Sequence, residues 1–347
     1  MTMRAAVLRE HRFQVEDLPT PQPGPGQVLV KVRACGICGS DLHFFKHADH
    51  MVEQARKLGA PTAELERGLA TGLVLGHEFV GEIVAFGPGA GQALKLGDRV
   101  CSMPFVLKDA GPALIGSNPE TSGAYAEYMV LTAALCLKVD AAIPDEAAAL
   151  TEPLGIAVHA VNKAAMQPGD VAVVIGCGPI GLAVTAMLKI RGVSTIVASD
   201  LSPRRRALAL EMGATQVIDG RQESAVMAAA QAAPAARMVI FENTGAPGML
   251  GRLVVEAPQN AKLVVSGIAA GEESLIPLVA IMKELQISFI IYYTPEEFAE
   301  ALALIRDGKL NWKPLVTGTV GLADVNDAFK ALEDPEIHAK ILIDPRR

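Results

Sequence analysis

The chain has 347 residues, of which 50% are hydrophobic, and a formal net charge of −7. This length allows two domains with sizeable cores, and an acidic balance without a long basic segment argues against nucleic acid as a partner. No apolar run approaches the roughly 18 residues that a membrane span needs, and the N-terminus lacks the apolar core of a secretory signal, so we expect a cytoplasmic protein with no membrane partner. The five cysteines have no disulfide-rich spacing and are expected to be free thiols.

The N-terminal part of the chain is predicted to be rich in β-strands. Apolar and polar residues alternate over 28–33, directly after a stretch of prolines and glycines at 21–26, and a second strand-like run covers 82–86. The short spacing of glycine and proline favours a small, irregular barrel over a helical bundle.

From about residue 155, short apolar strands alternate with helices. Helices are predicted over 180–191 and 203–212, the second with Ser202 as its N-cap and Pro203 at its first position. Strand, helix and strand at this rhythm indicate a parallel sheet with crossover helices. The strands are expected at 171–175, 195–199, 216–218, 238–241 and 262–265.

The C-terminal part is predicted to mix helices with a last strand. Thr294 and Glu297 have the spacing of a capping box, which opens a helix that ends at Gly308. A further helix is expected over 324–333 and a strand over 340–343.

A glycine-rich loop follows the strand at 171–175 and opens the next helix, which is the context of a dinucleotide-binding loop. Residues 176–181 read Gly-Cys-Gly-Pro-Ile-Gly, and Asp200 ends the next predicted strand, 24 residues after Gly176. The glycines let the backbone approach a pyrophosphate, and the carboxylate would accept hydrogen bonds from a ribose, which favours NAD over NADP. The alternative is a glycine-rich turn that binds nothing. The expected cofactor contacts here are Gly176, Gly178, Pro179, Ile180, Gly181 and Asp200.

Three arginines at 204–206 bear on that preference. One of them could hold the additional phosphate of NADP. We favour a solvated helix face instead, because the carboxylate sits at the strand tip where the two cofactors are distinguished. Arg205 is kept among the cofactor-binding candidates.

Potential metal ligands occur in three separate motifs. Cys35 and Cys38 form a Cys-x-x-Cys pair, His77 and Glu78 are adjacent, and Glu152 precedes a proline. Alone, these patterns are typical of a redox pair, a core histidine and a surface glutamate. No second Cys-x-x-Cys completes a four-cysteine site, so the sequence indicates a mixed set of cysteine, histidine and carboxylate ligands with an open position, as in catalytic zinc sites.

The order of these motifs resembles that of the zinc-dependent medium-chain dehydrogenases, in the branch of the sorbitol and threonine dehydrogenases. The resemblance covers essentially the whole chain. It rests on Gly-His-Glu-x-x-Gly at 76–81, Gly-Asp-Arg-Val at 97–100, Glu-Pro-Leu at 152–154, the nucleotide loop and the C-terminal return.

The resemblance implies an α/β protein of two domains. A GroES-like, β-rich catalytic domain is expected over 1–154, a Rossmann NAD-binding domain with a doubly wound parallel sheet over 155–288, and a return to the catalytic domain over 289–347. The implied activity is hydride transfer between an alcohol and NAD, which gives a ketone or an aldehyde. A homodimer or homotetramer is also implied.

For the site, the resemblance implies one catalytic zinc in the cleft between the domains, with Cys38 and His77 as ligands. Glu78 and Glu152 are both expected near the ion, and the sequence does not rank them as the third ligand. Asp41 is expected to hold the His77 ring in its binding tautomer. Zinc would act as a Lewis acid on the substrate oxygen.

Two further groups of residues take roles from the resemblance. Ser40 and His43 match the proton relay, although a structural hydrogen bond is the alternative for His43. The residues expected near the nicotinamide, at the ends of the later strands, are Thr244, Gly245, Gly267 and Ile268. Cys35 and Cys177 are expected to be small buried thiols and not ligands.

The sequence departs from the family pattern at one lobe. Many members hold a structural zinc there with four closely spaced cysteines, but residues 101–127 contain only Cys101, so no structural zinc is expected.

The segment 47–71 is longer than expected for this branch. A helical face is predicted to contain Met51, Val52, Ala55 and Leu58, and this helix either packs on the surface or covers the mouth of the pocket.

Three residues bear on the substrate. Phe44, Phe45 and Met103 predict an apolar pocket, which favours a secondary alcohol that is apolar or cyclic over a free polyol.

Two other classes of protein were weighed. A zinc-free reductase of activated double bonds predicts the loss of Cys38 and His77, and both are present. A non-catalytic nucleotide-binding module predicts a broken relay, whereas Ser40, Asp41 and His43 are all intact.

Overall fold

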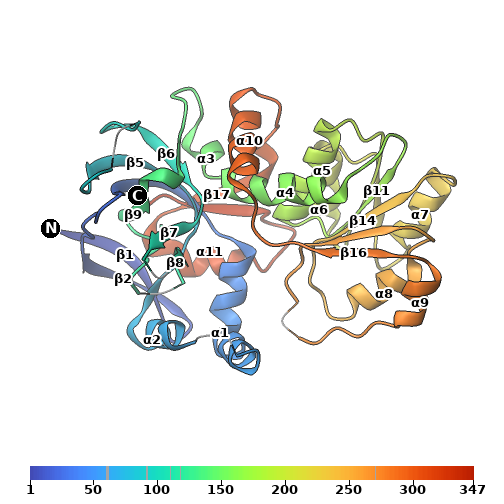
Figure 1. Cartoon of the computed structure of the whole chain (residues 1–347), viewed down its shortest axis with the longest axis horizontal. Helices are drawn as coiled ribbons and strands as arrows, with labels where there is room; N and C mark the ends of the chain where they lie inside the picture. The colour runs from blue at the N-terminus through green and yellow to red at the C-terminus, as the bar shows by residue number, and fades with distance from the viewer. Residues whose placement is uncertain (60–61, 91–92, 110, 118, 270) are drawn as a thin grey trace. The chain divides into compact units, whose positions relative to one another are not determined.

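A computed structural model of the protein describes residues 1–59, 62–90, 93–109, 111–117, 119–269 and 271–347. The chain divides into two compact units, which Figure 1 allows the reader to follow by colour. The first unit comprises Met1–Glu152, Val316–Asp334 and Lys340–Arg347, and the second comprises Pro153–Leu315 and Pro335–Ala339. Among the described residues, no helix is both long enough and apolar enough to cross a membrane.

The first unit is built mainly from antiparallel strands. One sheet has the order β2-β1-β4, a larger one has the order β10-β6-β5-β3-β18-β17 with β9 also paired to β3, and β7 pairs with β8. The strands are β1 (Thr2–Arg9), β2 (Arg12–Pro19), β3 (Gln27–Gly36), β4 (Leu73–Val74), β5 (Glu78–Phe86), β6 (Arg99–Ser102), β7 (Phe105–Lys108), β8 (Gly111–Leu114), β9 (Tyr128–Thr132), β10 (Cys136–Lys138), β17 (Val316–Val320) and β18 (Lys340–Ile343).

Helices α1 (Gly39–Lys57), α2 (Ala63–Thr71), α3 (Asp145–Ala148) and α11 (Val325–Ala331) complete this unit. Its core contains an aromatic cluster, which we define as Phe13, Phe45, Tyr125 and Phe329. The ring centroids of Phe13 and Phe329 are 4.7 Å apart, and those of Phe13 and Phe45 are 5.5 Å apart. The cluster therefore joins β2, α1 and α11 through side chains that are far apart in sequence.

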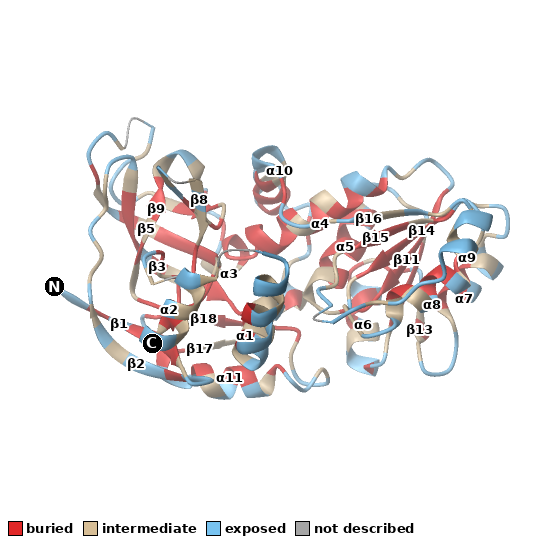
Figure 2. Ribbon diagram, turned by 60° about the horizontal axis from the view of Figure 1, so that its bottom comes forward, coloured by how far each residue is buried: buried red, intermediate tan, exposed pale blue. Residues whose placement is uncertain are grey.

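The second unit is a parallel sheet with the order β13-β12-β11-β14-β15-β16, which is that of a doubly wound nucleotide-binding sheet. Every residue of β11 and β14 is buried, as Figure 2 shows, because helices cover the sheet. Its elements are α4 (Thr151–Ala164), β11 (Val171–Ile175), α5 (Pro179–Ile190), β12 (Thr195–Asp200), α6 (Pro203–Glu211), β13 (Gln216–Asp219), α7 (Ala225–Ala232), β14 (Met238–Glu242), α8 (Met249–Glu256), β15 (Lys262–Val265), α9 (Pro277–Met282), β16 (Gln286–Phe289) and α10 (Pro295–Arg306).

The predicted strands of this sheet are confirmed to within one residue at each end. Ser202 caps α6 by accepting a hydrogen bond from the Arg205 amide, and Thr294 and Glu297 form the predicted capping box at α10. The helix predicted over 324–333 is shorter in the structure, where α11 covers Val325–Ala331 and follows a 3-10 turn at Leu322–Asp324.

The units divide at other points than the predicted domains. The first division follows Glu152 and not residue 154, and the second follows Leu315 and not residue 288. The second difference has a physical reason. Helix α10 is tied to the nucleotide-binding sheet's helices, since Glu297 accepts a hydrogen bond from His159 on α4 and Glu300 pairs with Arg191 after α5.

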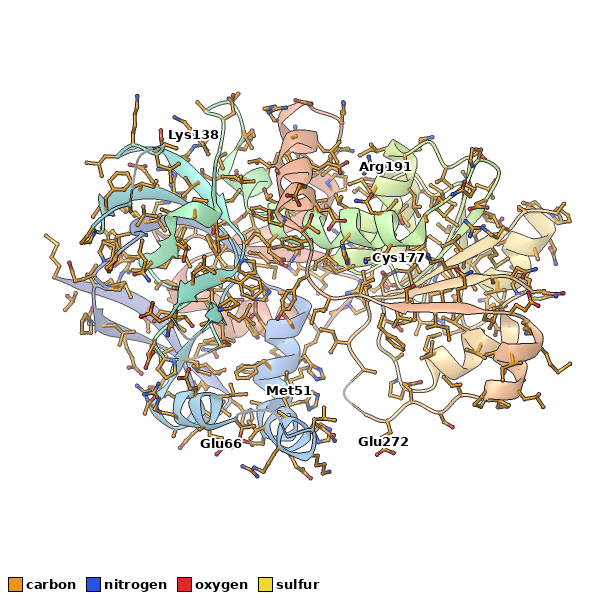
Figure 3. All side chains as sticks on the ribbon, viewed as in Figure 1. Met51, Glu66, Lys138, Cys177, Arg191 and Glu272 are labelled. Carbon is orange, nitrogen blue, oxygen red and sulfur yellow. The ribbon has the colours of Figure 1, made fainter. Side chains whose placement is uncertain are left out.

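The long segment between the two site motifs forms the rest of α1 and all of α2, and Figure 3 labels Met51 and Glu66 on these helices. Residues 60 and 61 of this segment lie outside the described residues. Val52 is buried as predicted, but Leu58 is 84% exposed because α1 ends at residue 57. Leu58 therefore does not belong to the buried face.

Candidate active site

Asp41 links two of the predicted zinc-site residues. Its Oδ2 accepts a hydrogen bond of 3.1 Å from the Cys38 amide at the start of α1, and its Oδ1 lies 3.5 Å from Nδ1 of His77. The carboxylate is buried, which raises its pKa, but His77 and the hydrogen bonds that it accepts outweigh burial and lower the pKa. Burial lowers the pKa of His77, and the charges of Asp41 and Cys38 reverse this and hold it well above its usual range.

Glu78 is held by a lysine that the sequence analysis did not identify. The Lys340 ammonium donates to both carboxylate oxygens of Glu78, at 2.8 and 2.5 Å, and to the Ile37 carbonyl at 3.1 Å. The two side chains are only 2% and 1% exposed. The sequence feature that could have identified Lys340 is its place at the start of the predicted strand 340–343, whose other residues are all apolar.

The space for the Glu78 side chain depends on a glycine. A Cβ at Gly36 would lie 2.0 Å from Oε2 of Glu78, so a larger residue there would displace the carboxylate. Gly36 and Glu78 are register partners in the antiparallel pair of β3 and β5.

Glu152 is the second predicted carboxylate and lies in the first turn of α4. It is buried, with 7% of its surface exposed. Burial lowers the pKa of Lys340, but the charges of Glu78, Cys38 and Glu152 and the hydrogen bond to Glu78 outweigh burial and raise the pKa.

The donor types fit zinc. A thiolate, an imidazole and a carboxylate are the ligands of catalytic zinc sites, and a carboxylate on the far nitrogen of a ligand histidine is the usual outer partner. In the conformation described, however, no group of three or more such side chains among the described residues has the spacing to hold a metal ion. Cys38 and His77 are the pair in contact, through a side-chain hydrogen bond that contributes to the raised pKa of His77.

Ser40 and His43 both lie in the first turns of α1, three residues apart and therefore on one helix face. Both are half-buried. Burial lowers the pKa of His43, as do the charges of His47 and His50, so the ring is readily neutral. The ring centroids of His43 and His47 are 5.0 Å apart.

Two residues predicted to line the substrate pocket have another role. Phe44 and Phe45 pack against the core of the first unit, and Phe45 belongs to the aromatic cluster. They therefore give no support to the prediction of an apolar pocket.

The remaining cysteines behave as buried thiols, and all five cysteines are free. Burial raises the pKa of Cys35 well above its ordinary value and that of Cys101 to about 12. Cys177, which Figure 3 labels, also has a pKa raised by burial. Burial therefore favours the protonated form of these thiols.

The loop between β11 and α5 has the geometry that a pyrophosphate requires. Gly176 has a φ of +86°, and a Cβ at Gly181 would lie 1.8 Å from the Gly176 carbonyl oxygen. A Cβ at Gly178 would meet open space. Gly176 and Gly181 are thus needed for the turn itself, and Gly178 leaves room in front of the α5 N-terminus.

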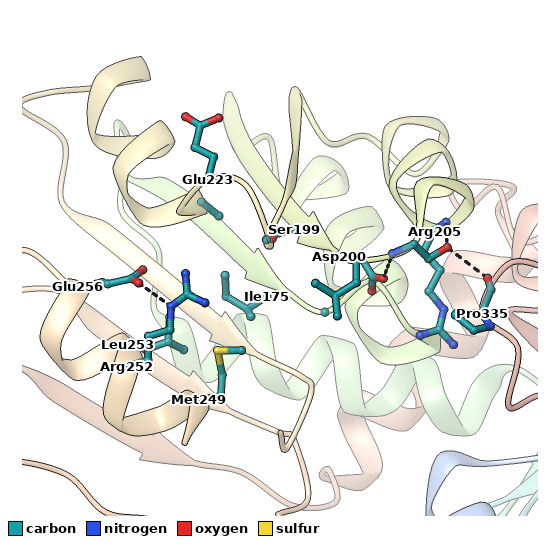
Figure 4. A pocket seen from close by; sticks show the side chains of 15 residues that line it. Ile175, Ser199, Asp200, Arg205, Glu223, Met249, Arg252, Leu253, Glu256 and Pro335 are labelled. Atoms are coloured by element: carbon teal, nitrogen blue, oxygen red, sulfur yellow. Dashed lines mark hydrogen bonds and ion pairs between the residues drawn. The ribbon is translucent and has the colours of Figure 1, made fainter. Parts of the chain in front are cut away.

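Asp200 lies at the tip of β12 beside this loop. Its Oδ2 accepts a hydrogen bond from the Cys177 amide and its Oδ1 accepts one from the Ser202 amide, each at 2.8 Å. It lines a pocket of about 290 Å³ with Ser199, Arg205 and Pro335, which Figure 4 shows from close by.

The three arginines of α6 differ in their surroundings. Arg206 donates hydrogen bonds to the backbone carbonyls of Asp200 and Leu201 and forms an ion pair with Asp219. Arg205 lines the pocket, and its buried Nε has no hydrogen-bond partner in the described part of the chain. A buried donor of this kind needs an acceptor from a bound molecule or water.

The predicted nicotinamide-side residues come together in two adjoining loops. A Cβ at Gly245 would lie 2.4 Å from the Ile268 carbonyl oxygen, and a Cβ at Gly267 would lie 2.2 Å from the Gly245 amide nitrogen. The buried carboxylate of Glu242 shapes this region, since it accepts hydrogen bonds from the amides of Thr244 at 2.7 Å and Gly245 at 3.1 Å. Glu242 was missed, although a carboxylate that ends a buried strand is a recognisable signal.

Comparison with known proteins agrees with this geometry. Residues 24–141 match the family of the alcohol dehydrogenase GroES-like domain, and residues 179–307 match the zinc-binding dehydrogenase family. The first match includes Cys38, His77 and Glu78, and the second begins at Pro179 in the nucleotide loop.

Whole-length relatives extend the match. The chain is 31% identical over 344 residues to (R,R)-butanediol dehydrogenase of Bacillus subtilis, covering 96% of each chain, and 30% identical to sorbitol dehydrogenase of the same organism, covering 99% of this chain and 98% of the relative. A crystal structure of 2R,3R-butanediol dehydrogenase from Bacillus subtilis superimposes with a TM-score of 0.84 at 30% identity over 99% of both chains. A solved alcohol dehydrogenase from Escherichia coli CFT073, in complex with NADH, is 25% identical over 99% of both chains, with a TM-score of 0.84. The chain belongs to the zinc-dependent medium-chain alcohol dehydrogenases and is an NAD-dependent oxidoreductase of that family.

Proposed function

We propose that the protein interconverts a small secondary alcohol and its ketone, with one catalytic zinc and NAD. The observation that carries this proposal is the position of Asp41, whose carboxylate meets both the Cys38 amide and the His77 ring. One buried carboxylate thus fixes the backbone at Cys38, where it also caps α1, and meets the ring of His77, as an outer partner of a metal ligand does. When bound, zinc would supply Lewis acidity at the substrate oxygen and NAD would supply the hydride acceptor.

Cys38, His77 and Glu152 are the residues that we expect to hold zinc. Glu78 is the weaker candidate, because both of its oxygens are bound by the Lys340 ammonium. Glu152 carries a buried negative charge close enough to influence Lys340, as do Cys38 and Glu78. Zinc binding would then require the side chains of Cys38, His77 and Glu152 to turn towards a common point, since they are not spaced for metal in the conformation described.

Ser40 and His43 are proposed to carry the alcohol proton. The Ser40 hydroxyl would accept the proton of the substrate hydroxyl while passing its own onward, and His43 would take it up. The lowered pKa of His43 keeps the ring neutral near pH 7, which is the form that accepts a proton. The half-buried position of His43 allows release to water.

The pocket beside Asp200 is proposed to hold the adenosine ribose. The free lone pairs of the Asp200 carboxylate would accept from the ribose hydroxyls, and Arg205 Nε would donate to a ribose oxygen. Gly176, Gly178, Pro179, Ile180 and Gly181 would face the pyrophosphate, and Thr244, Gly245, Gly267 and Ile268 would frame the nicotinamide.

The substrate class follows from the relatives. The two Bacillus subtilis relatives are named for a diol and a polyol, both of which carry secondary hydroxyls. Phe44 and Phe45 pack against the core of the first unit, so two of the three apolar residues named for the pocket do not argue against a polar substrate. We therefore propose vicinal diols and small secondary alcohols together, ahead of bulky cyclic alcohols.

We further propose a homodimer that forms through the β16 edge of the parallel sheet. β16 is the last strand in that sheet, and large apolar side chains are exposed on it and on α9. A monomer rarely exposes so many such side chains together. The exposed residues are Ile276, Leu278, Ile281, Met282, Phe289 and Ile291.

We also propose a cytoplasmic location, where free thiols persist.

A substrate screen tests the proposed activity. Purified protein is incubated with NAD and a panel of diols, linear secondary alcohols and cyclic alcohols, and NADH absorbance is followed with and without a strong zinc chelator. We expect NADH to form with diols or secondary alcohols and to disappear after chelation. Reduction of an activated double bond that survives chelation would instead identify the zinc-free class of reductase.

A further inference from the structure

Tyr125 is a completely buried tyrosine whose hydroxyl has a charged partner. Its Oη donates a hydrogen bond of 2.8 Å to Oδ2 of Asp41, and the residue has no exposed surface. A buried phenol that bonds a carboxylate is a specific interaction, because neither group finds water to replace the other. The same Asp41 oxygen also accepts from the Cys38 amide.

The ring of Tyr125 is fixed from several sides. It lies edge-on to Phe13 at 5.9 Å and to Phe329 at 6.2 Å between ring centroids. A Cβ at Gly76 would lie 2.5 Å from Cδ1 of Tyr125, so the glycine before His77 leaves the space that the ring fills. The aromatic cluster thus prevents the hydroxyl from leaving Asp41.

The backbone of Tyr125 is tied to the segment that carries His77. The Tyr125 amide donates to the Leu75 carbonyl at 3.0 Å, and the Ala124 amide donates to the Gly76 carbonyl at 2.9 Å. Tyr125 therefore contacts the chain just before His77 through its backbone and ring, and it contacts the start of α1 through Asp41. These are the two segments that supply Cys38 and His77.

We propose that Tyr125 is a positioning residue for the zinc site, which acts through Asp41 to hold the Cys38 and His77 segments at a fixed separation. This inference rests on the proposed function, since it requires that Cys38 and His77 bind zinc. When the Tyr125 hydroxyl is present, it fixes the orientation of the Asp41 carboxylate. Oδ2 then accepts from the phenol and from the Cys38 amide, and Oδ1 faces His77. Without the hydroxyl, Oδ2 keeps only the Cys38 amide of these two donors, so the carboxylate is held less firmly towards the His77 ring.

The substitution Tyr125→Phe tests this role, because it keeps the ring in the aromatic cluster and removes only the hydroxyl. The zinc dissociation constant is measured by competition with a chromophoric chelator. We expect affinity to fall about tenfold, the lower end of the effect of losing an outer partner of a metal ligand. Tyr128→Phe is the matched control, since it removes a phenol from β9 of the same unit, and it should leave zinc affinity unchanged.

A second readout reports on the geometry of the site. In protein loaded with cobalt in place of zinc, the visible absorption bands should differ between Tyr125→Phe and the unaltered protein, because they respond to ligand arrangement. In the double variant of Tyr125→Phe with Asp41→Asn, zinc affinity should equal that of Asp41→Asn alone, because the phenol acts only through this carboxylate. Unchanged affinity and unchanged cobalt bands in Tyr125→Phe would overturn the proposal.

A measurement without any substitution covers the case in which Tyr125→Phe folds poorly. In protein labelled with ¹³C at the tyrosine Cζ, the Tyr125 signal should shift on zinc binding and that of Tyr128 should not. A Tyr125 signal insensitive to zinc would contradict the inference. If the unaltered protein bound no zinc at all, the proposed function itself would fail, which is a different result from tight zinc binding that is indifferent to Tyr125.

Discussion

The ammonium of Lys340 contacts both carboxylate oxygens of Glu78, and the two residues stand 262 positions apart in the chain. The pair links β18 to β5 across β3, the strand that lies between them in the sheet. Since both side chains are removed from water, each charge depends on the other.

Lys340→Met should destabilise the protein by about 3–5 kcal/mol, because it leaves the Glu78 carboxylate buried without a partner. Adding Glu78→Gln should recover much of this loss, since no unpaired charge then remains. Chemical denaturation of the two variants and the unaltered protein measures the free energies of unfolding. A double variant as unstable as Lys340→Met would show that the packing of the lysine chain, and not its charge, is decisive.

One zinc ion per chain is expected, with Glu152 as the third ligand. Glu152→Gln should abolish stoichiometric zinc after dialysis, whereas the double variant of Glu78→Gln with Lys340→Met should retain zinc. Metal analysis of the purified proteins gives the zinc content of each variant.

Removing zinc from the unaltered protein should leave its circular dichroism nearly unchanged, since the stretch 101–127 contains a single cysteine and its described part is held by ion pairs such as Lys108 with Glu120. Two zinc ions per chain, or unfolding after chelation, would reveal a structural site.

Ser40→Ala should lower the rate of NADH formation by roughly 10²–10⁴-fold while zinc content and NAD binding stay the same, because a positioned proton-transfer group contributes that much. The rate is best taken from a rapid-mixing experiment, in which release of NADH does not limit the signal. Ser117→Ala, which removes a hydroxyl that bonds the Leu114 carbonyl, serves as a control. An unaffected hydride-transfer rate in Ser40→Ala would exclude this hydroxyl from the relay.

NAD should be used better than NADP by at least about tenfold in kcat/KM, since a repulsive contact of about 1.4 kcal/mol is enough for that ratio. The repulsion comes from the Asp200 carboxylate at the tip of β12. Asp200→Ala should narrow the ratio, and Arg205→Ala should weaken binding of NAD. Comparable use of both cofactors by the unaltered protein would mean that Arg205 controls the choice instead.

Asp145 should make the first unit sensitive to acid. Its carboxylate accepts hydrogen bonds from Arg33 at 2.8 Å and Arg99 at 2.7 Å. Burial raises its pKa, but the two guanidinium groups outweigh burial and lower the pKa below the ordinary 3.8. A depressed pKa stabilises the fold above the unfolded-state value, and this contribution is lost as the pH falls through the folded-state value.

Asp145→Asn should therefore destabilise the protein at pH 7 by about 1.5–3 kcal/mol, the usual contribution of a hydrogen bond to a charged group. The difference should shrink as the pH is lowered below 3.8, where the unaltered carboxylate also takes up a proton. Thermal unfolding followed across this range measures it. A difference that does not change with pH would show that the effect comes from packing alone.

Much of the second unit could be predicted from the amino-acid sequence, because its signals are local. A run such as 171–175 is apolar on both faces, as a central parallel strand must be, and the glycines at 176 and 181 are required by the turn that they form. Asp200 follows at the tip of the next strand, so its place beside the loop is a consequence of strand order. The family and its activity followed from motifs whose order along the chain is itself informative.

The partners of the site residues were decided only by tertiary structure. Nothing local shows that Glu78 is paired with a lysine, because the fold brings Lys340 to it from 262 residues away. In the same way, Tyr125 reaches Asp41 only because backbone pairing places it beside Gly76, and Phe45 packs on Phe13, which is 32 residues earlier in the chain. Local sequence specifies strands, caps and turns through short-range sterics, whereas the charge state and orientation of a buried side chain depend on whichever distant residues share its space.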